Sequence, residues 1–143
     1  MLKEKLKAIQ VRDVMSNKVI TVKESDDFAL VNEKMDLYDI RHLPVVDDKG
    51  NLVGLITQRD LYKIHSPRRL EDGSWFYDKD ALNGFILSAV MLRNVLTISP
   101  EASLYQAVDN MVNLKVGCLI VINAFKKPVG IITRVDVLKF FLI

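Results

Sequence analysis

An internal repeat constrains the possible folds of this chain more than any other feature of its sequence. Residues 53–61 read Val-Gly-Leu-Ile-Thr-Gln-Arg-Asp-Leu, and residues 129–137 read Val-Gly-Ile-Ile-Thr-Arg-Val-Asp-Val. The two stretches are offset by 76 residues, as from Thr57 to Thr133, and the same offset matches residues of the two repeats without a gap well outside these stretches. The repeat predicts four segments: an N-terminal helical segment 1–10, repeat one at 11–65, a linker 66–86 and repeat two at 87–143.

Length and charge narrow the classes of protein to consider. A chain of 143 residues has the size of one compact domain in which two repeats share a core, and half of the residues are hydrophobic. The formal net charge of +2 is too small to indicate a nucleic-acid partner, and the basic residues are scattered along the chain. We therefore expect no nucleic-acid partner.

The termini and the cysteine content predict a cytoplasmic location. Cys118 is the one cysteine, so an intramolecular disulfide framework is excluded and a reducing compartment is expected. It lies in an apolar run and is interpreted as a buried small hydrophobe. Residues 1–7 are too charged for the apolar part of a signal peptide. No apolar stretch reaches the about 20 residues of a membrane helix, so no membrane partner is expected.

Each repeat is predicted to run β-α-β-β-α. Residues 19–22 and 95–98 are rich in β-branched side chains, which favours extended strands. Ser25-Asp26-Asp27 and Ser99-Pro100-Glu101 carry residues typical of helix starts. The remaining elements are expected as hairpin strands at 43–46 and 52–57 and at 118–122 and 129–133, final helices that Asp60 and Asp136 open, and a helix over 2–9.

The first helix of each repeat is expected to bury an apolar stripe, and the linker is expected to be irregular. The stripes are Phe28, Val31, Met35 and Tyr38 in repeat one, and Leu104, Ala107, Val108, Met111 and Leu114 in repeat two. Residues 66–84 have no counterpart inside a repeat and contain Pro67 and Gly73, which are typical of an irregular connection. The aromatic cluster Trp75-Phe76-Tyr77 is interpreted as fastening that linker rather than covering a ligand.

The Thr-x-x-Asp turn of each repeat contains the residues best suited to bind a ligand. A carboxylate that follows a strand can accept bonds from the paired hydroxyls of a ribose, and a helix start favours anions. Arg59 and Arg134 lie in these turns and suit a phosphate. The same spacing also forms a helix cap that needs no ligand. For one motif the cap is the better interpretation, whereas the duplication makes ligand binding equally favoured.

These motifs resemble the tandem cystathionine β-synthase (CBS) domains of a Bateman module. The resemblance rests on the signature Gly-h-h-Thr-x-x-Asp (h, hydrophobic) at 54–60 and 130–136, on Leu43-Pro44-Val45-Val46-Asp47, and on the lead-in residues Val14-Met15 and Val19 to Val22. It covers the chain except for the N-terminal segment and the linker. The resemblance implies an α/β (α+β) fold of two repeats packed sheet to sheet with pseudo-twofold symmetry, leaving two clefts between them.

The resemblance also implies a regulatory adenosine-containing ligand, of the AMP, ADP, ATP, NAD or S-adenosylmethionine class, rather than a cofactor. Asp60 and Asp136 would hold ribose hydroxyls, and Thr57 and Thr133 would contact the phosphate or ribose. Some members use basic residues where this chain has Arg41-His42. The adenine would lie against Val19, Ile20, Thr21 and Pro44, or against Val95, Leu96, Thr97 and Ile120.

Differences between the repeats predict two unequal clefts. Gly117-Cys118 replaces Arg41-His42, and Ile120 replaces Pro44. Arg134 directly follows Thr133, where repeat one has Gln58, so we expect Thr133-Arg134-Val135-Asp136 to be the stronger ribose–phosphate site. His42 facing a phosphate and His42 at a strand end remain equal interpretations. The two isolated histidines and the one cysteine have no metal-site spacing.

Three functions are compared. An enzyme would need a nucleophile–base pair or a metal constellation, and the sequence shows neither, so no enzymatic activity is expected. A regulatory module would bind an adenine nucleotide and signal to an unidentified downstream protein. The alternative is a ligand-free dimerisation or interaction module with degenerate clefts. For either module we expect a C2 homodimer, because the apolar end Phe140-Phe141-Leu142-Ile143 should be packed in the core or against another subunit.

Overall fold

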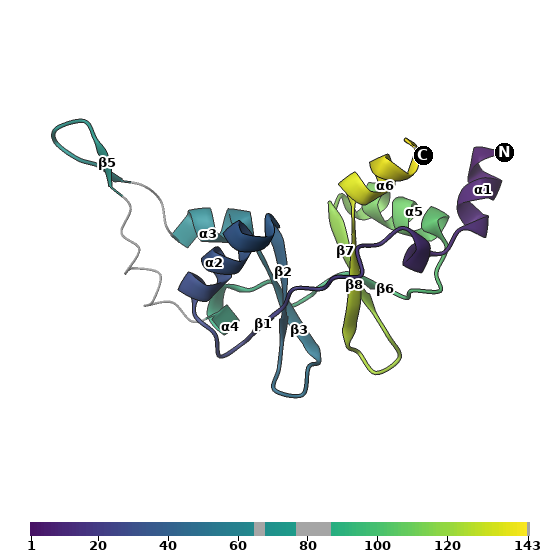
Figure 1. Cartoon of the computed structure of the whole chain (residues 1–143), viewed down its shortest axis with the longest axis horizontal. Coiled ribbons are helices and arrows are strands. Elements are labelled where there is room, and N and C mark those ends of the chain that lie inside the picture. Colours follow the sequence, from purple (N-terminus) through teal and green to yellow (C-terminus); the bar gives the residue numbers. More distant parts are fainter. Residues whose placement is uncertain (65–67, 77–86, 143) are drawn as a thin grey trace. The chain divides into compact units, whose positions relative to one another are not determined.

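The computed structural model describes residues 1–64, 68–76 and 87–142 and has a mixed α/β fold with two small three-stranded sheets (Figure 1). The chain divides into two compact units. Unit 1 consists of Met1–Val19 and Val95–Ile143, and unit 2 consists of Ile20–Asn94. His65, Tyr77 and Ile143 lie outside the described residues.

Unit 2 holds the first sheet. Its strands are β1 (Val22–Lys23), β2 (His42–Val46) and β3 (Leu52–Thr57), in the order β1-β2-β3, with β1 parallel and β3 antiparallel to β2. The helices are α2 (Phe28–Tyr38), α3 (Gln58–Ile64) and α4 (Leu87–Val90). The core of the unit combines side chains of the sheet with side chains of all three helices, among them Phe28, Val31, Leu43, Ile56, Leu61 and Leu87.

Helix α2 begins and ends as its sequence predicts, but its buried stripe is shorter. The Asp27 carboxylate accepts a hydrogen bond from the Leu30 N–H at 2.9 Å and caps the helix. The helix ends at Asp39, which adopts a left-handed conformation (φ 52°). Phe28, Val31 and Met35 are buried as expected. The prediction for Tyr38 was wrong: this side chain is 41% exposed, because it belongs to the last residue of the helix.

Unit 1 repeats this architecture. Its strands are β6 (Thr97–Ile98), β7 (Cys118–Ile122) and β8 (Pro128–Thr133), in the order β6-β7-β8 with the same strand directions as unit 2. The helices are α1 (Leu2–Ala8), η1 (Val11–Asp13, a 3-10 turn), α5 (Leu104–Leu114) and α6 (Arg134–Phe140). Helix α1 packs beside α5, and the Lys3 and Lys7 ammonium groups lie 5.2 and 5.3 Å from the Tyr105 ring centre.

The segment that leads into each repeat pairs with the hairpin of the other repeat. Ser16 and Ile131 exchange two backbone hydrogen bonds of 2.9 and 3.0 Å within unit 1. In unit 2, Leu55 and Leu92 do the same, again at 2.9 and 3.0 Å. The boundaries of the compact units are therefore offset from the boundaries of the sequence repeats.

Helix α5 begins at Leu104 rather than at Ser99-Pro100-Glu101, so that prediction was wrong. The Ser103 hydroxyl caps the helix by accepting a bond from the Gln106 N–H at 3.0 Å. The carbonyls of Pro100 and Ala102 instead accept the N–H groups of Arg12 and Val11. Long-range pairing with the lead-in therefore keeps residues 100–102 out of the helix.

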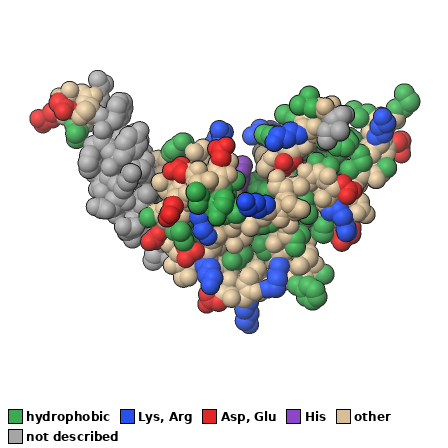
Figure 2. Space-filling view, viewed as in Figure 1, with side chains coloured by type: hydrophobic (Ala, Val, Ile, Leu, Met, Phe, Trp, Pro, Cys, Tyr) green, Lys and Arg blue, Asp and Glu red, His purple; other side chains and the backbone are tan. Residues whose placement is uncertain are grey.

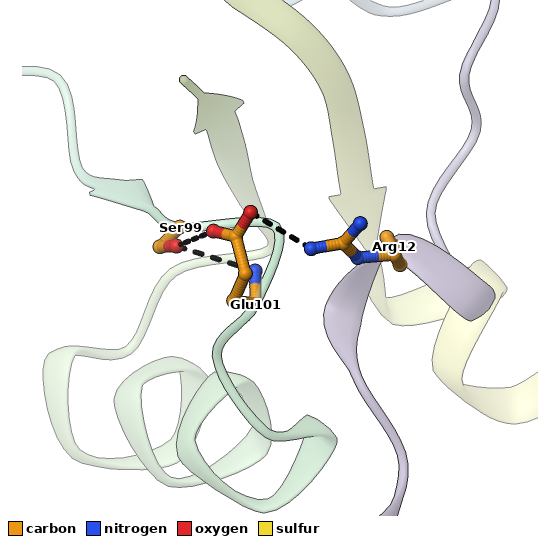
Figure 3. A network of polar contacts seen from close by, with 3 residues as sticks. All are labelled: Arg12, Ser99 and Glu101. Atoms are coloured by element: carbon orange, nitrogen blue, oxygen red, sulfur yellow. Dashed lines mark hydrogen bonds and ion pairs between the residues drawn. The ribbon is translucent and has the colours of Figure 1, made fainter. Parts of the chain in front are cut away.

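A small polar network accompanies this pairing (Figure 3). Arg12 forms a 2.7 Å ion pair with Glu101, whose carboxylate also accepts a bond from the Ser99 hydroxyl. The Ser99 bond, with a smaller contribution from Arg12, lowers the pKa of the Glu101 carboxyl below its ordinary value. Both charged side chains are exposed, so the network orients the turn before α5 and adds little to stability.

Several element boundaries differ from the prediction. Residues 19–21 and 95–96 lie outside the strands, because β1 and β6 pair with their neighbours over two residues each. Helices α3 and α6 begin two residues before Asp60 and Asp136. The expected burial of Leu114 is wrong, because this side chain is 51% exposed. At the C-terminus, Phe140 packs against the core of unit 1, whereas Phe141 is 50% and Leu142 86% exposed, so for these two residues packing against another subunit stays a prediction.

The linker is more regular than predicted where the structure describes it. β4 (Arg68–Arg69) and β5 (Trp75–Phe76) form a two-stranded antiparallel hairpin. Its turn is closed by a 2.7 Å bond from the Leu70 N–H to the Ser74 carbonyl, and Gly73 supplies the positive φ of 87°. The role assigned to the 75–77 aromatic cluster depends on residue 77, which lies outside the described residues.

Candidate ligand-binding turns

The strand-to-helix turn of repeat two is a complete capping box. The Thr133 hydroxyl accepts a bond from the Asp136 N–H at 3.2 Å, and the Asp136 Oδ2 accepts the Thr133 N–H at 2.9 Å. The same carboxylate oxygen accepts the Thr133 hydroxyl at 3.1 Å. These bonds satisfy two donors that would otherwise be unpaired at the start of α6.

The turn of repeat one has the same bonds. The Asp60 Oδ2 accepts the Thr57 N–H at 2.8 Å and the Thr57 hydroxyl at 3.1 Å, and the Thr57 hydroxyl accepts the Asp60 N–H at 3.4 Å. The capping interpretation is therefore confirmed in both repeats. The cap uses Oδ2 of each aspartate. The second oxygen, Oδ1, takes no part in the cap and is the acceptor that a ligand would use.

The second oxygen has different surroundings in the two turns. The Ser16 hydroxyl lies 3.5 Å from Asp136 Oδ1, at the limit of a hydrogen bond. At the equivalent lead-in position, repeat two has Leu92, which has no side-chain donor. In the part of the chain that the structure describes, Asp60 Oδ1 accepts no hydrogen bond. Asp136 thus has a polar neighbour that the sequence reasoning missed.

Asp136 lines a small hollow of unit 1. The hollow has a volume of about 140 Å³ and is lined by Asp13, Val14, Asp136, Lys139 and Phe140. Lys139 supplies a positive charge beside two carboxylates, and Phe140 supplies an aromatic wall. The volume is below the roughly 300–1,000 Å³ that is typical of small-molecule sites. Asp13 and Lys139 were also missed, although Lys139 matches Lys63 in the repeat.

Arg134 does not share that hollow. Its guanidinium lies against Gly117, where an added Cβ would come to 3.0 Å from Nε and Nη2. It lines a separate, larger hollow of about 490 Å³ between α5 and α6. Arg134 and Asp136 are therefore close in sequence, but their side chains line different hollows. The expected ribose–phosphate site, with Asp136 on the ribose and Arg134 on the phosphate, stays a prediction.

The interpretation of Cys118 as a small buried hydrophobe is confirmed, because its side chain is buried. Burial raises the pKa of its thiol to about 11, and the nearby Arg134 charge offsets this only in part. The thiol stays protonated and unreactive at neutral pH.

The basic residues of repeat one lie around the corresponding strand and turn. The Gln58 N–H donates to the Arg41 carbonyl at 2.9 Å, and His42 lies opposite Thr57 in the β2–β3 pair. Arg41 and Arg59 are exposed and His42 is half-buried. Residues 41, 42 and 57 are thus brought together, while Pro44 is buried opposite Leu55.

The residues expected to contact adenine divide between the two units. Ile20 packs on the core of unit 2. Thr21 and Pro44 also belong to unit 2, whereas Val19 belongs to unit 1. The Lys34 ammonium donates to the Thr21 carbonyl at 2.7 Å and is a further cation that the sequence reasoning missed. In unit 1, β6 and β7 bring together Leu96, Thr97 and Ile120 beside half-buried Val95.

The described residues have neither a cluster of metal ligands nor a membrane-spanning helix. Within 1–64, 68–76 and 87–142, no three side chains of His, Cys, Asp or Glu cluster in a way that suits a metal ion. None of the helices in these ranges has the length and apolar character needed to span a bilayer.

Comparison with known proteins identifies the class. The model of the CBS domain matches residues 11–66 and 87–143, which are the two sequence repeats. The chain therefore belongs to the CBS domain family and carries two copies of the domain in tandem. A CBS domain-containing protein of Dictyostelium discoideum is 30% identical over 94% of this chain and 92% of its own length.

Other relatives contain the pair within a longer chain. This chain spans 32% of an uncharacterised Methanocaldococcus jannaschii protein and 23% of an L-aspartate semialdehyde sulfurtransferase from the same organism, at 30% and 26% identity. Among solved structures, the CBS domain of a membrane protein from Sphaerobacter thermophilus has a TM-score of 0.80 at 29% identity, covering 96% of this chain and 91% of that one.

A further solved structure carries ligands. The CBS domain pair of protein MJ0100 was solved in complex with 5′-methylthioadenosine and S-adenosyl-L-methionine. It is 26% identical to this chain, with a TM-score of 0.75, and the match covers 92% of this chain and 94% of that one.

Proposed function

We propose that this protein is a regulatory CBS pair that binds an adenosine-containing ligand and passes the change to a partner protein. One observation carries the proposal: each repeat places a Thr–Asp capping box at a strand-to-helix turn, and the cap uses a single carboxylate oxygen. The remaining oxygen is an acceptor in a fixed position, which suits a ribose hydroxyl. The ligands bound to the similar MJ0100 pair support the same class.

Asp136 is the better candidate of the two aspartates for the ribose. It lines the hollow with Lys139 and Phe140, and the Ser16 hydroxyl lies beside its second oxygen. Lys139, rather than Arg134, is the cation that lines this hollow. The adenine would lie against the residues that the sequence assigned to it within the same unit as Asp136, which are Val95, Leu96, Thr97 and Ile120.

The chemistry of the described residues supports regulation rather than catalysis. The Thr–Asp pairs are held in caps, and the Cys118 thiol is protonated at neutral pH. The proposal accordingly includes no reaction of the bound ligand. It includes a homodimer, because Val112 and Leu138 of unit 1 and Tyr62 of unit 2 expose large hydrophobic surfaces. A downstream protein would read the change that the ligand causes.

A thermal-unfolding panel tests the proposal. The protein is heated with S-adenosylmethionine, 5′-methylthioadenosine, AMP, ADP, ATP or NAD, and with GTP and CTP as controls. A ligand that binds only the folded state, at 100 times its Kd, adds about 2.7 kcal/mol to the free energy of unfolding. We expect at least one adenosyl compound to raise the melting temperature more than the guanine and cytosine nucleotides do.

The variant Asp136→Asn tests the role of this residue, because it keeps an acceptor oxygen for the cap and removes the negative charge. It should unfold near the wild-type temperature without ligand and should lose most of the ligand-induced shift. An adenosyl panel that leaves the melting temperature unchanged would favour the ligand-free interaction module instead.

A further inference from the structure

The turns that join the two hairpin strands have the same backbone bonds in both units. In unit 1, the Asn123 Oδ1 accepts the N–H groups of Phe125 and Lys127 at 2.9 and 3.1 Å. In unit 2, Asp47 lies at the equivalent position, and its Oδ1 accepts the two equivalent N–H groups, both at 2.9 Å. The two turns can therefore be compared residue by residue.

The side chains of the two turns differ in charge and polarity. Residues 47–51 read Asp-Asp-Lys-Gly-Asn, with two acids and one base, whereas residues 123–127 read Asn-Ala-Phe-Lys-Lys, with two bases and no acid. We define the basic tip as residues 124–127, all of which are exposed. Phe125 is 77% exposed and does not belong to the core of unit 1. The basic tip thus combines an exposed aromatic ring with two ammonium groups.

Lys126 occupies a position whose geometry favours glycine. It has a left-handed conformation (φ 62°), and the equivalent residue of unit 2 is Gly50 (φ 84°). Glycine adopts this conformation without strain, whereas a residue with a Cβ does so at a cost. The N–H groups of both residues donate to the carbonyl three positions earlier at 3.0 Å. The stability of the turn therefore does not explain the lysine, and a functional role for its charge does.

The basic tip lies at the free end of the β7–β8 hairpin. Figure 1 shows this turn at the end of unit 1 that lies away from α5 and α6. Figure 2 shows hydrophobic side chains at the same end of unit 1, with Lys or Arg side chains beside them. The residues of the tip line neither the hollow of Asp136 nor the hollow of Arg134. The tip is thus separate from the candidate ligand site.

We infer that the basic tip docks on an anionic lipid surface. The Phe125 ring would enter the boundary between headgroups and acyl chains, where aromatic side chains are favoured, and the lysine ammonium groups would meet the headgroup charges. A lysine close to an anionic leaflet strengthens binding about fivefold, which corresponds to about 1 kcal/mol. This contact goes beyond the proposed function and needs no membrane-spanning helix.

The small size of the tip favours a lipid surface over a macromolecular partner. A specific protein interface buries roughly 1,000 Å² or more in total, which four residues of one turn do not supply. Single-stranded nucleic acid is bound along a basic groove that follows several phosphates, whereas the tip is one projecting point. A lipid surface requires only an inserted apolar side chain and nearby cations.

Vesicle binding tests the inference with the full chain. The protein is sedimented with vesicles of phosphatidylcholine alone and with vesicles of phosphatidylcholine and phosphatidylserine. We expect half of the protein to bind the anionic vesicles at a lipid concentration on the order of 1 mM, with much weaker binding to the neutral ones. In 1 M NaCl, where the Debye length is about 3 Å, this difference should disappear.

Two variants remove the two parts of the tip. Lys126→Gly installs the residue of the other repeat and should weaken binding to anionic vesicles about fivefold, while raising the melting temperature because the strain is relieved. Phe125→Ala should weaken it about tenfold, because the ring no longer leaves water. The matched control is Lys49→Ala, which removes a lysine from the equivalent turn of unit 2 and should leave vesicle binding unchanged.

Three results would overturn the inference. Equal binding of Phe125→Ala and wild type would reduce the contact to unspecific attraction of charges, and a loss in Lys49→Ala as large as in Lys126→Gly would remove the tip from it. A wild type that binds neither kind of vesicle would favour an acidic pocket on a partner protein instead. Adenosyl-induced thermal shifts should be the same in all these variants, so they report the proposed function separately.

Discussion

The sulfur of Met15 lies against Gly130, in the space that a side chain at residue 130 would occupy. The same relationship joins Met91 to Gly54 in unit 2, where the Leu92 carbonyl oxygen would also lie 3.2 Å from an added Cβ. The glycine that opens each Gly-h-h-Thr-x-x-Asp motif therefore makes room for the lead-in segment that pairs with its strand. This close approach explains why the motif has a glycine in the middle of a strand.

Replacing these glycines should destabilise the protein unequally. We expect Gly54→Ala to lower the free energy of unfolding by about 1–3 kcal/mol, and Gly130→Ala by less. At Gly54 the obstacles are a backbone oxygen and the buried Met91, whereas at Gly130 they belong to the flexible Met15 side chain. Urea unfolding measures both. In the Gly130→Ala background, Met15→Ala should cost less than it does alone, and strict additivity would contradict the contact.

Ligand affinity should depend more on Asp136 than on Asp60. The reason is the hollow that Asp136 lines with Lys139, together with the Ser16 hydroxyl near its second oxygen. Calorimetric titration with the best adenosyl ligand compares Asp136→Ala with Asp60→Ala. Each variant should also lose about 1 kcal/mol of stability with its cap, so folding is checked first. Wild-type affinity in Asp136→Ala would contradict the assignment, and a larger loss at Asp60 would move the site to the Arg41-His42 turn.

Alkaline pH should destabilise the protein through Cys118. Its pKa is raised in the folded state to about 11 from an ordinary value of 9.0, so the folded state holds the proton more tightly. The stabilisation is fully present below pH 9 and is lost as the pH rises towards 11, to a total of about 3 kcal/mol. Unfolding of wild type and Cys118→Ala from pH 8 to 11 isolates this contribution. Parallel curves would show that the thiol is not desolvated.

The Glu101 carboxyl should titrate below its ordinary range, with Ser99 as the main cause. The hydrogen bond from the Ser99 hydroxyl lowers the pKa more than the Arg12 charge does. We therefore expect Ser99→Ala to raise the Glu101 pKa by more than Arg12→Ala, as followed by NMR titration of the carboxyl carbon. Added salt should reduce the Arg12 effect and leave the Ser99 effect, because the ion pair is exposed. The reverse order would assign the shift to the ion pair.

Local signals predicted most of the fold. The hairpin strands and the cap at Asp27 depend on neighbouring residues, and the structure confirms them. The start of α5 was missed because Ser99 and Ser103 are both good capping residues. The choice between them depends on the bonds from Val11 and Arg12, about 90 residues away in sequence. A local rule cannot include that pairing.

The candidate site was predictable in residue type but not in side-chain direction. The capping box at Thr133 and Asp136 follows from spacing alone, and it is present. The direction of Arg134 follows instead from the absence of a side chain at Gly117, which becomes its neighbour only when β7 and β8 pair. Ser16 and Asp13 reach Asp136 through the pairing of the lead-in with Ile131, so their sequence positions did not reveal them.

The pairing of the lead-in segments also sets an order for folding during synthesis. Unit 2 is one continuous stretch of chain, whereas unit 1 needs residues 1–19 together with residues 95–143. On the ribosome, unit 2 can therefore fold before residues 95–143, with which the N-terminal segment packs, have been translated. Unit 1 is completed last and closes the longest loop in the chain, which is an entropic cost that grows only slowly with loop length.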